Sequence, residues 1–293
     1  ANGVLGNMVL SGGLLLSLGP AGLTGFEQQA ALTQRIAAAE KQEGRSGWAS
    51  IKKAELALLS RDHATALARL RKVVDSKLDP ALKARWRSAY WTALEGAVRA
   101  DLKGAPQEIE DLASLVRSPE ERLKVTRLRS ERAVARGDYV QAVAMFRSLA
   151  DQAPGRLVRR GEATRVEVRM DRWVSGQLAD LWTRLPAELK SQLDGELKKS
   201  ATSVIEGPLA AARKFVVVFG FHPAATSVRF HLAEQAARAG RLAEAETDWL
   251  TLAGDRDPVV VERAEASLAA SMKQQGLSDM PATVTWPAEV SII

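Results

Sequence analysis

Apolar residues recur every three or four positions over most of residues 28–276, which is the spacing of helices with one buried face. The clearest case is the stretch 227–258, where two such stripes flank Gly240 and a Pro at position 258 ends the second. The stripes are Val228, Leu232, Ala236 and Ala239, followed by Leu242, Ala245, Trp249 and Leu252. The pattern predicts two antiparallel helices that meet at small residues.

The same arrangement recurs along the chain with less regular sequences. Gly137 and Arg61 occupy positions equivalent to Gly240, and their separations approach two and three repeat units of about 34 residues. We expect Leu67, Val143 and Trp249 to be buried on second helices. The predicted helices cover residues 28–43, 48–60, 64–74, 81–102, 107–116, 119–135, 139–150, 156–173, 177–185, 187–202, 209–221, 227–239, 242–252 and 259–275.

The two ends of the chain have a different pattern. Residues 1–26 carry no charge, and short apolar runs at 8–10, 14–18 and 23–26 are separated by glycines. This spacing of glycines favours a β-meander over the alternative, a membrane span or signal peptide, because glycine suits a helix interior poorly. The last residues include Val290, Ile292 and Ile293, which predict a strand-like tail.

The helix–turn–helix stretch 227–258, with small residues around its turn, resembles a tetratricopeptide repeat. That resemblance implies a right-handed α-solenoid, in which each repeat covers its neighbour's apolar face. The stretch 11–27, SGGLLLSLGPAGLTGFE, resembles the last hairpin of a blade in the quinoprotein-like (PQQ-type) β-propellers. The Asp-Gly turn usual in that family is replaced by Gly12-Gly13, and no cofactor-binding residue is carried over.

The chain as a whole resembles large multi-repeat proteins of planctomycete-type bacteria, and the stretch 214–223, KFVVVFGFHP, is particularly similar to them. Those proteins combine PQQ-like propellers with tetratricopeptide-like segments, and some are described as membrane-coat-like. The resemblance implies a scaffold that binds another protein, located in the bacterial periplasm or cell envelope, with possible membrane association. We therefore expect a mostly α chain divided into a β-meander at 1–27, a solenoid at 28–276 and an extended tail at 277–293.

The amino-acid composition excludes several kinds of chemical site. The chain has no cysteine, which excludes disulfides, thiolate metal sites and cysteine nucleophiles. It contains neither a phosphate-binding glycine loop nor a His-Glu-x-x-His motif, and it has only three histidines, His63, His222 and His231. We expect a surface role for His63 and a helix C-terminal cap for His222. The sequence predicts no enzyme, no catalytic residue, no cofactor, no metal site and no transmembrane helix.

The net charge of +6 is compatible with an anionic partner. Arginines recur at helical spacing on two predicted helices and form the candidate contacts with such a partner: Arg122, Arg129, Arg132, Arg136, Arg165, Arg169 and Arg172. One alternative is a solvated face on which these arginines pair with nearby acidic residues. The other is a module that binds an anionic polymer or membrane surface. Nucleic acid is disfavoured, since exposed aromatic residues are not interleaved with the arginines.

Overall fold

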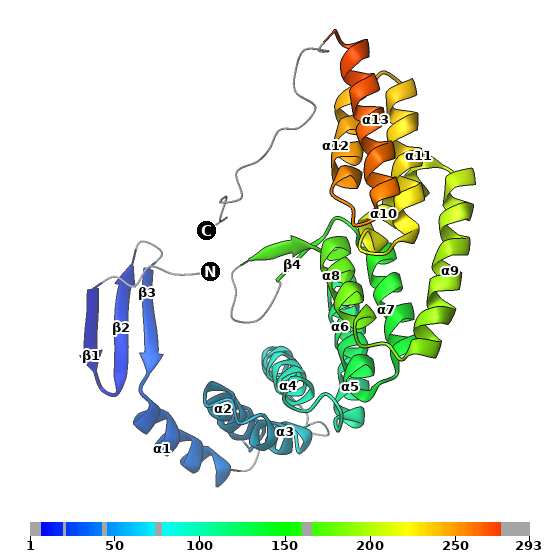
Figure 1. The fold of residues 1–293 in the computed structure, drawn as a ribbon. Coiled ribbons are helices and arrows are strands. Elements are labelled where there is room, and N and C mark those ends of the chain that lie inside the picture. The colour runs from blue at the N-terminus through cyan, green and yellow to red at the C-terminus, as the bar shows by residue number, and fades with distance from the viewer. Residues whose placement is uncertain (1–6, 20–21, 43–45, 74–77, 160–165, 277–293) are drawn as a thin grey trace. The chain divides into compact units, whose positions relative to one another are not determined.

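The computed structural model describes residues 7–19, 22–42, 46–73, 78–159 and 166–276 (Figure 1). These residues form thirteen helices and five strands, so the predicted, mostly helical class is confirmed. The chain divides into two compact units, unit 1 (Ala1–Arg136) and unit 2 (Gly137–Ile293). The boundary falls in the turn predicted between the helices at 119–135 and 139–150. The strand-like tail predicted at the C-terminus lies outside the described residues.

Unit 1 begins with the predicted β-meander, an antiparallel sheet in the order β1-β2-β3. Leu10, Leu15 and Phe26 stand opposite one another across the three strands and so share a face. The other face carries Val9 and Leu16, also in register. The three strands are β1 (Asn7–Ser11), β2 (Leu14–Gly19) and β3 (Gly22–Glu27). Both faces of the sheet are therefore apolar.

The helices of unit 1 pack mainly against their neighbours in sequence (Figure 1). Helix α2 contacts both α3 and α4, then α4 contacts α5, and α5 contacts α6. Ile51, Leu70, Leu94 and Leu112, from four different helices, are fully buried in one core. The helices are α1 (Gln29–Glu40), α2 (Ser46–Leu59), α3 (His63–Arg71), α4 (Pro80–Ala100), α5 (Pro106–Ser114) and α6 (Pro119–Arg136).

Unit 2 contains a second series of packed helices. Helices α11, α12 and α13 follow one another as antiparallel neighbours, while α10 contacts α8, α9 and α11 (Figure 1). Trp249 of α12 is buried between its neighbours, as predicted. The helices are α7 (Tyr139–Gln152), α8 (Met170–Trp182), α9 (Ala187–Glu206), α10 (Leu209–Phe219), α11 (Ala224–Arg238), α12 (Leu242–Ala253) and α13 (Pro258–Gln274). The contacts indicate helical repeats.

The turns that follow α2, α6 and α11 have the backbone conformation that the sequence predicts. Gly137 and Gly240 have φ values of +79° and +74°, and Arg61, at the equivalent position, has +58°. Among the described residues Arg61 is the one non-glycine with positive φ. The amide N–H groups of Asp62 and Arg241 each reach back five residues to a carbonyl, at 2.9 Å in both turns. This is the Schellman pattern that ends a helix, so the alignment of these turns is confirmed.

Two sequence-based predictions in unit 2 are wrong. The helix expected at 156–173 forms only from Met170 onward, where α8 starts; before it, β4 (Leu157–Arg159) pairs with β5 (Glu167–Arg169). Valines at alternate positions, which favour strands, explain the change. Val143, expected to be buried like Leu67, is only half-buried, because Ala142 and Phe146 make the contacts of α7.

No helix in the described part of the chain is both long and apolar enough to cross a membrane.

Candidate functional site

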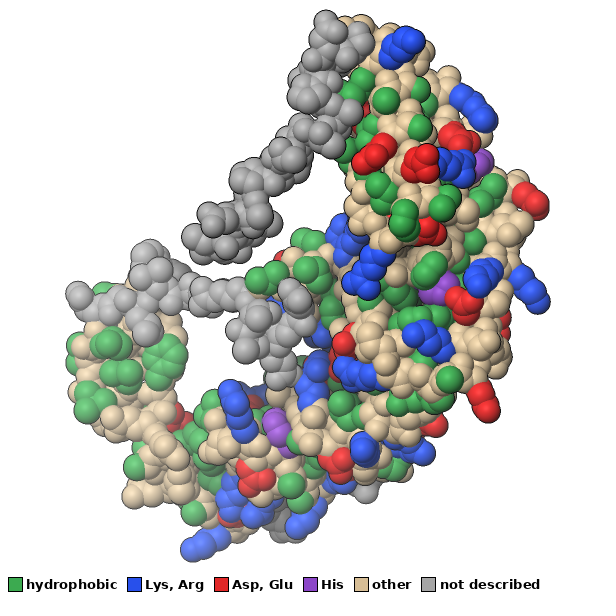
Figure 2. Space-filling model, in the orientation of Figure 1, with side chains coloured by type: hydrophobic (Ala, Val, Ile, Leu, Met, Phe, Trp, Pro, Cys, Tyr) green, Lys and Arg blue, Asp and Glu red, His purple; other side chains and the backbone are tan. Residues whose placement is uncertain are grey.

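The arginines predicted on one face of α6 do lie on that helix, in unit 1. Arg122 and Arg136 are exposed, while Arg129 and Arg132 are half-buried. Arg129 donates to Glu110 of α5 at 2.8 Å, which neutralises one charge of the stripe. Glu131, an acidic residue on the same helix, pairs with Arg99 and Arg127, which are not part of this stripe. Figure 2 shows basic and acidic side chains interspersed on the visible surface.

The second group of predicted arginines does not share a helix. Arg169 ends strand β5, and Arg172 lies in the first turn of α8. Arg165 lies outside the described residues. Arg169 donates two hydrogen bonds to the buried carboxylate of Asp171, at 3.2 and 2.6 Å, whereas Arg172 is exposed. The prediction that these arginines form one stripe on a helix is therefore wrong, because the strand–helix junction separates their side chains.

His222 has a different role from the predicted C-terminal cap. Its Nδ1 accepts the amide N–H of Ala224 at 3.1 Å, so it supports the start of α11 rather than the end of α10. Its Nε2 lies 3.0 Å from Oδ1 of Asp194, although the ring is poorly oriented for a hydrogen bond. Burial of the ring lowers the pKa of His222 despite the nearby carboxylate of Asp194. Burial therefore favours the neutral form of His222.

His63, for which a surface role is expected, is half-buried. The imidazole of His63 packs against α4 at Gly96, and its Nδ1 is buried without a hydrogen-bond partner in the part of the chain that the structure describes. Within the described residues, no group of three or more acidic or histidine side chains could hold a metal ion. The structure therefore assigns His63 to helix packing and His222 to helix capping.

A groove of about 530 Å³ lies beside His63 in unit 1 and includes Arg71 and Glu108. Arg71 is paired there: Nη2 of its guanidinium donates to Glu108 at 3.0 Å and to Asp111 at 3.2 Å. Tyr90 also donates to Asp111, at 3.0 Å. These bonds connect α3, α4 and α5, so the charges beside this groove stabilise the helix stack.

Unit 2 contains a larger groove, of about 910 Å³, which we call the α11–α13 groove. Its walls come from the loop before α11, from α11 itself, from the end of α12 and from the start of α13. The residues that line it are Gly220, Phe221, His222, Pro223, Thr226, Arg229, Thr251, Leu252, Gly254, Asp255, Arg256, Asp257 and Val260. It combines an apolar floor with a few charged groups, which is the usual composition of a binding site.

Arg229 is the most unusual charged residue in this groove. It projects from α11, its side chain is only 19% exposed, and its Nη1 lies 3.5 Å from Oδ1 of Asp248 on α12. That distance is at the limit of a hydrogen bond. Burial raises the pKa of Asp248, and burial lowers the pKa of Arg229. Neither charge is therefore well compensated by the other.

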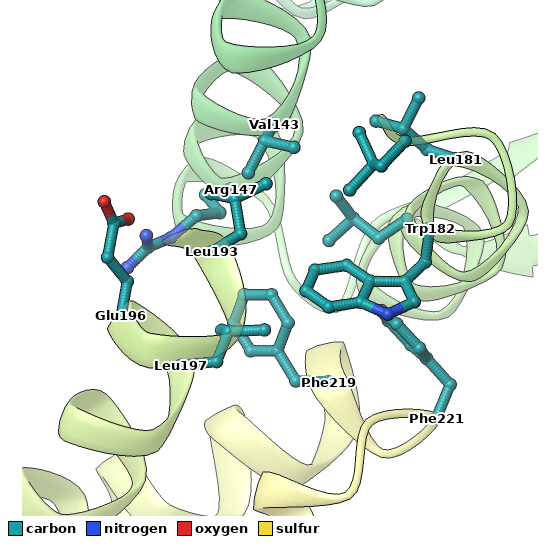
Figure 3. A pocket seen from close by; sticks show the side chains of 11 residues that line it. Val143, Arg147, Leu181, Trp182, Leu193, Glu196, Leu197, Phe219 and Phe221 are labelled. Carbon is teal, nitrogen blue, oxygen red and sulfur yellow. The ribbon is translucent and has the colours of Figure 1, made fainter. Parts of the chain in front are cut away.

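An apolar cavity lies next to the groove, among α7, α8, α9 and α10 (Figure 3). Trp182, Leu193, Phe219 and Phe221 surround it, and its volume of about 20 Å³ suits little more than one water molecule. Phe221 also lines the α11–α13 groove, so the same side chain borders both spaces. The cavity is too small to hold a ligand, and it marks the apolar core behind the groove.

No family model, no curated protein and no solved structure matches this chain.

Proposed function

We propose that this chain is a non-enzymatic scaffold, a right-handed tetratricopeptide-like solenoid that binds a partner protein through the α11–α13 groove. The repeated Schellman turns at Arg61 and Gly240 support this architecture, as do helices that mainly contact their neighbours in sequence. Such stacks present extended concave surfaces to partners. The resemblance to coat-like bacterial proteins supports the cell envelope as the location.

The observation that carries the proposal is the groove itself. It is the largest of the grooves described above, and Phe221, Leu252 and Val260 give it an apolar floor. Thr226 and Arg229 of α11 supply polar groups beside this floor. A peptide segment can bury apolar side chains there and satisfy its own polar groups at the walls.

The groove can be tested with random dodecapeptides displayed on phage and selected against the whole chain. Thr226→Trp fills the groove, and Thr247→Trp places the same side chain on an exposed site of α12 outside it. We expect the selected peptides to bind the parent chain and Thr247→Trp, and to lose binding to Thr226→Trp. Equal binding to both variants, or no selected peptide at all, would reject the groove as the binding site.

We also propose that the N-terminal sheet belongs to a larger β-structure, as the resemblance to a propeller blade implies. Val9 and Leu10 lie on opposite faces and are 61% and 62% exposed, and Figure 2 shows apolar side chains over this sheet. A sheet with two apolar faces is typical of a layer covered on both sides. Three strands alone are also only marginally stable in water.

Deletion of residues 1–27 tests this second part of the proposal. If the sheet belongs to a larger β-structure, the helices should keep their melting temperature after the deletion, and the chain should become more soluble. Unfolding of the helices after deletion would show that the sheet is an integral cap of unit 1, and the propeller interpretation would fail.

A further inference from the structure

We propose that Arg229, with Arg172 near it, binds the carboxylate of an acidic residue in a peptide that occupies the α11–α13 groove. This inference rests on the proposed function and specifies the chemistry of the partner, a peptide segment containing Asp or Glu. Arg172 was one of the arginines that the sequence singled out for an anionic partner, whereas Arg229 was not.

The guanidinium of Arg229 lies close to the backbone at Gly220. A Cβ atom at Gly220 would lie 2.8 Å from Nη2 of Arg229, and 2.6 Å from the carbonyl oxygen of Val216. Gly220 and Arg229 both line the groove. The side chain of Arg229 is therefore packed at the groove wall, only 19% exposed, and a packed side chain loses less entropy when it binds a carboxylate.

Most hydrogen-bond donors of Arg229 have no partner among the described residues. Its guanidinium has five N–H donors, yet in this part of the chain Asp248 provides one contact, at 3.5 Å. By contrast, Arg87 of α4 makes contacts of 2.6 to 2.7 Å with Leu115 and with both oxygens of Glu121. Arg229 therefore retains donors for a bidentate bond to an external carboxylate.

The charges near Arg229 favour an anion. Arg172 is close enough for its positive charge to lower the pKa of Arg229 further, in addition to the effect of burial. Arg213, which also acts on Asp248, is paired with Glu244 at 3.2 Å. The positive charges of Arg229 and Arg172 therefore repel each other, and a carboxylate from a partner would relieve this repulsion.

The acidic residues of the groove do not oppose this assignment. Asp255 accepts the backbone N–H of Asp257, and Asp257 accepts that of Val259, each at 3.0 Å. These carboxylates shape the turn between α12 and α13. With Arg256, they leave the groove as a whole without a strong net charge, so selectivity for an acidic residue arises at Arg229.

Three variants separate recognition from simple ion pairing. Arg229→Gln removes the proposed anchor, and Asp248→Asn removes the carboxylate that competes for it. Arg238→Gln is the matched control, because this arginine lies on the opposite side of α11 and is 69% exposed. Each variant is tested with the dodecapeptides selected on the parent chain, by fluorescence anisotropy at two salt concentrations and with a melting curve as a folding check.

We expect the selected peptides to be enriched in Asp and Glu, and their affinity to fall about tenfold in Arg229→Gln. Asp248→Asn should raise the affinity several-fold, Arg238→Gln should leave it unchanged, and added salt should weaken binding to the parent chain. An equal loss of affinity in Arg229→Gln and Asp248→Asn would show an ordinary structural ion pair and overturn the inference. Groove-bound peptides without acidic enrichment would also overturn it while leaving the proposed function intact. Failure to select any peptide would reject both.

Discussion

Gly96 lies within helix α4, where alanine would normally be the better residue. A Cβ atom at this position would lie 2.1 Å from Cε1 of His63 and 2.3 Å from its Nδ1. Ordinary contacts begin near 3.4 Å, so the imidazole ring would have to move by more than an ångström. The ring of His63 therefore occupies the space that Gly96 leaves free.

Gly96→Ala brings two opposing effects. In an open helix the substitution would stabilise the fold by about 1 kcal/mol, because alanine has the higher helix propensity. Overpacking against His63 should cost about 1–3 kcal/mol. We therefore expect a net destabilisation of about 1 kcal/mol in the parent chain. In the His63→Ala background the clash is gone, and the same substitution should stabilise the protein by up to about 1 kcal/mol.

The assay is a double-mutant cycle measured by urea denaturation and followed by circular dichroism, comparing the parent, both single variants and the double variant. The effect of Gly96→Ala must change sign between the two backgrounds. A substitution that stabilises both backgrounds equally would refute the reasoning, because it would show that the imidazole does not occupy this space.

Three further predictions concern other positions. Arg61→Gly should raise the melting temperature, because glycine adopts the φ of +58° without strain; a gain of roughly 0.5–1 kcal/mol is expected, and Gly137→Val should lower the stability. Trp249→Ala should cost about 3–5 kcal/mol by chemical denaturation, but Trp249→Phe much less, because the buried Nε1–H has no hydrogen-bond partner among the described residues. His222 has a pKa lowered from 6.5, so the unfolded chain binds its proton first and stability should fall as the pH drops below about 6.5. In the His222→Asn variant, melting curves between about pH 7 and pH 5 should no longer show this loss of stability. An unchanged pH profile would show that other groups cause the loss of stability.

The helices and the sheet could be predicted because their determinants are local. The apolar residues around Trp249 recur at helical spacing, and Gly240 ends the preceding helix by adopting positive φ. The glycines that divide the first residues likewise fix the turns of the meander. Even Arg61, which has no special turn chemistry, could be placed by its equivalence to Gly240.

Short strands were harder to recognise. The hairpin of β4 and β5 has three residues per strand, and arginines are interspersed with its valines. The arginines of this hairpin are also compatible with a charged stripe on a helix. The strand structure is established only by the pairing of Leu157 with Arg169. That pairing depends on contacts distant in sequence, which no local pattern reports.

The candidate site could not be predicted at all, because its residues are close only in space. Phe221, Arg229, Leu252 and Val260 come from four successive segments, and each segment is ordinary when considered alone. The sequence determined where helices begin and end, since turn conformation and apolar spacing are properties of neighbouring residues. Tertiary packing decided which arginine was buried beside Gly220 with a distant counter-ion, because desolvation and charge pairing depend on the surrounding helices.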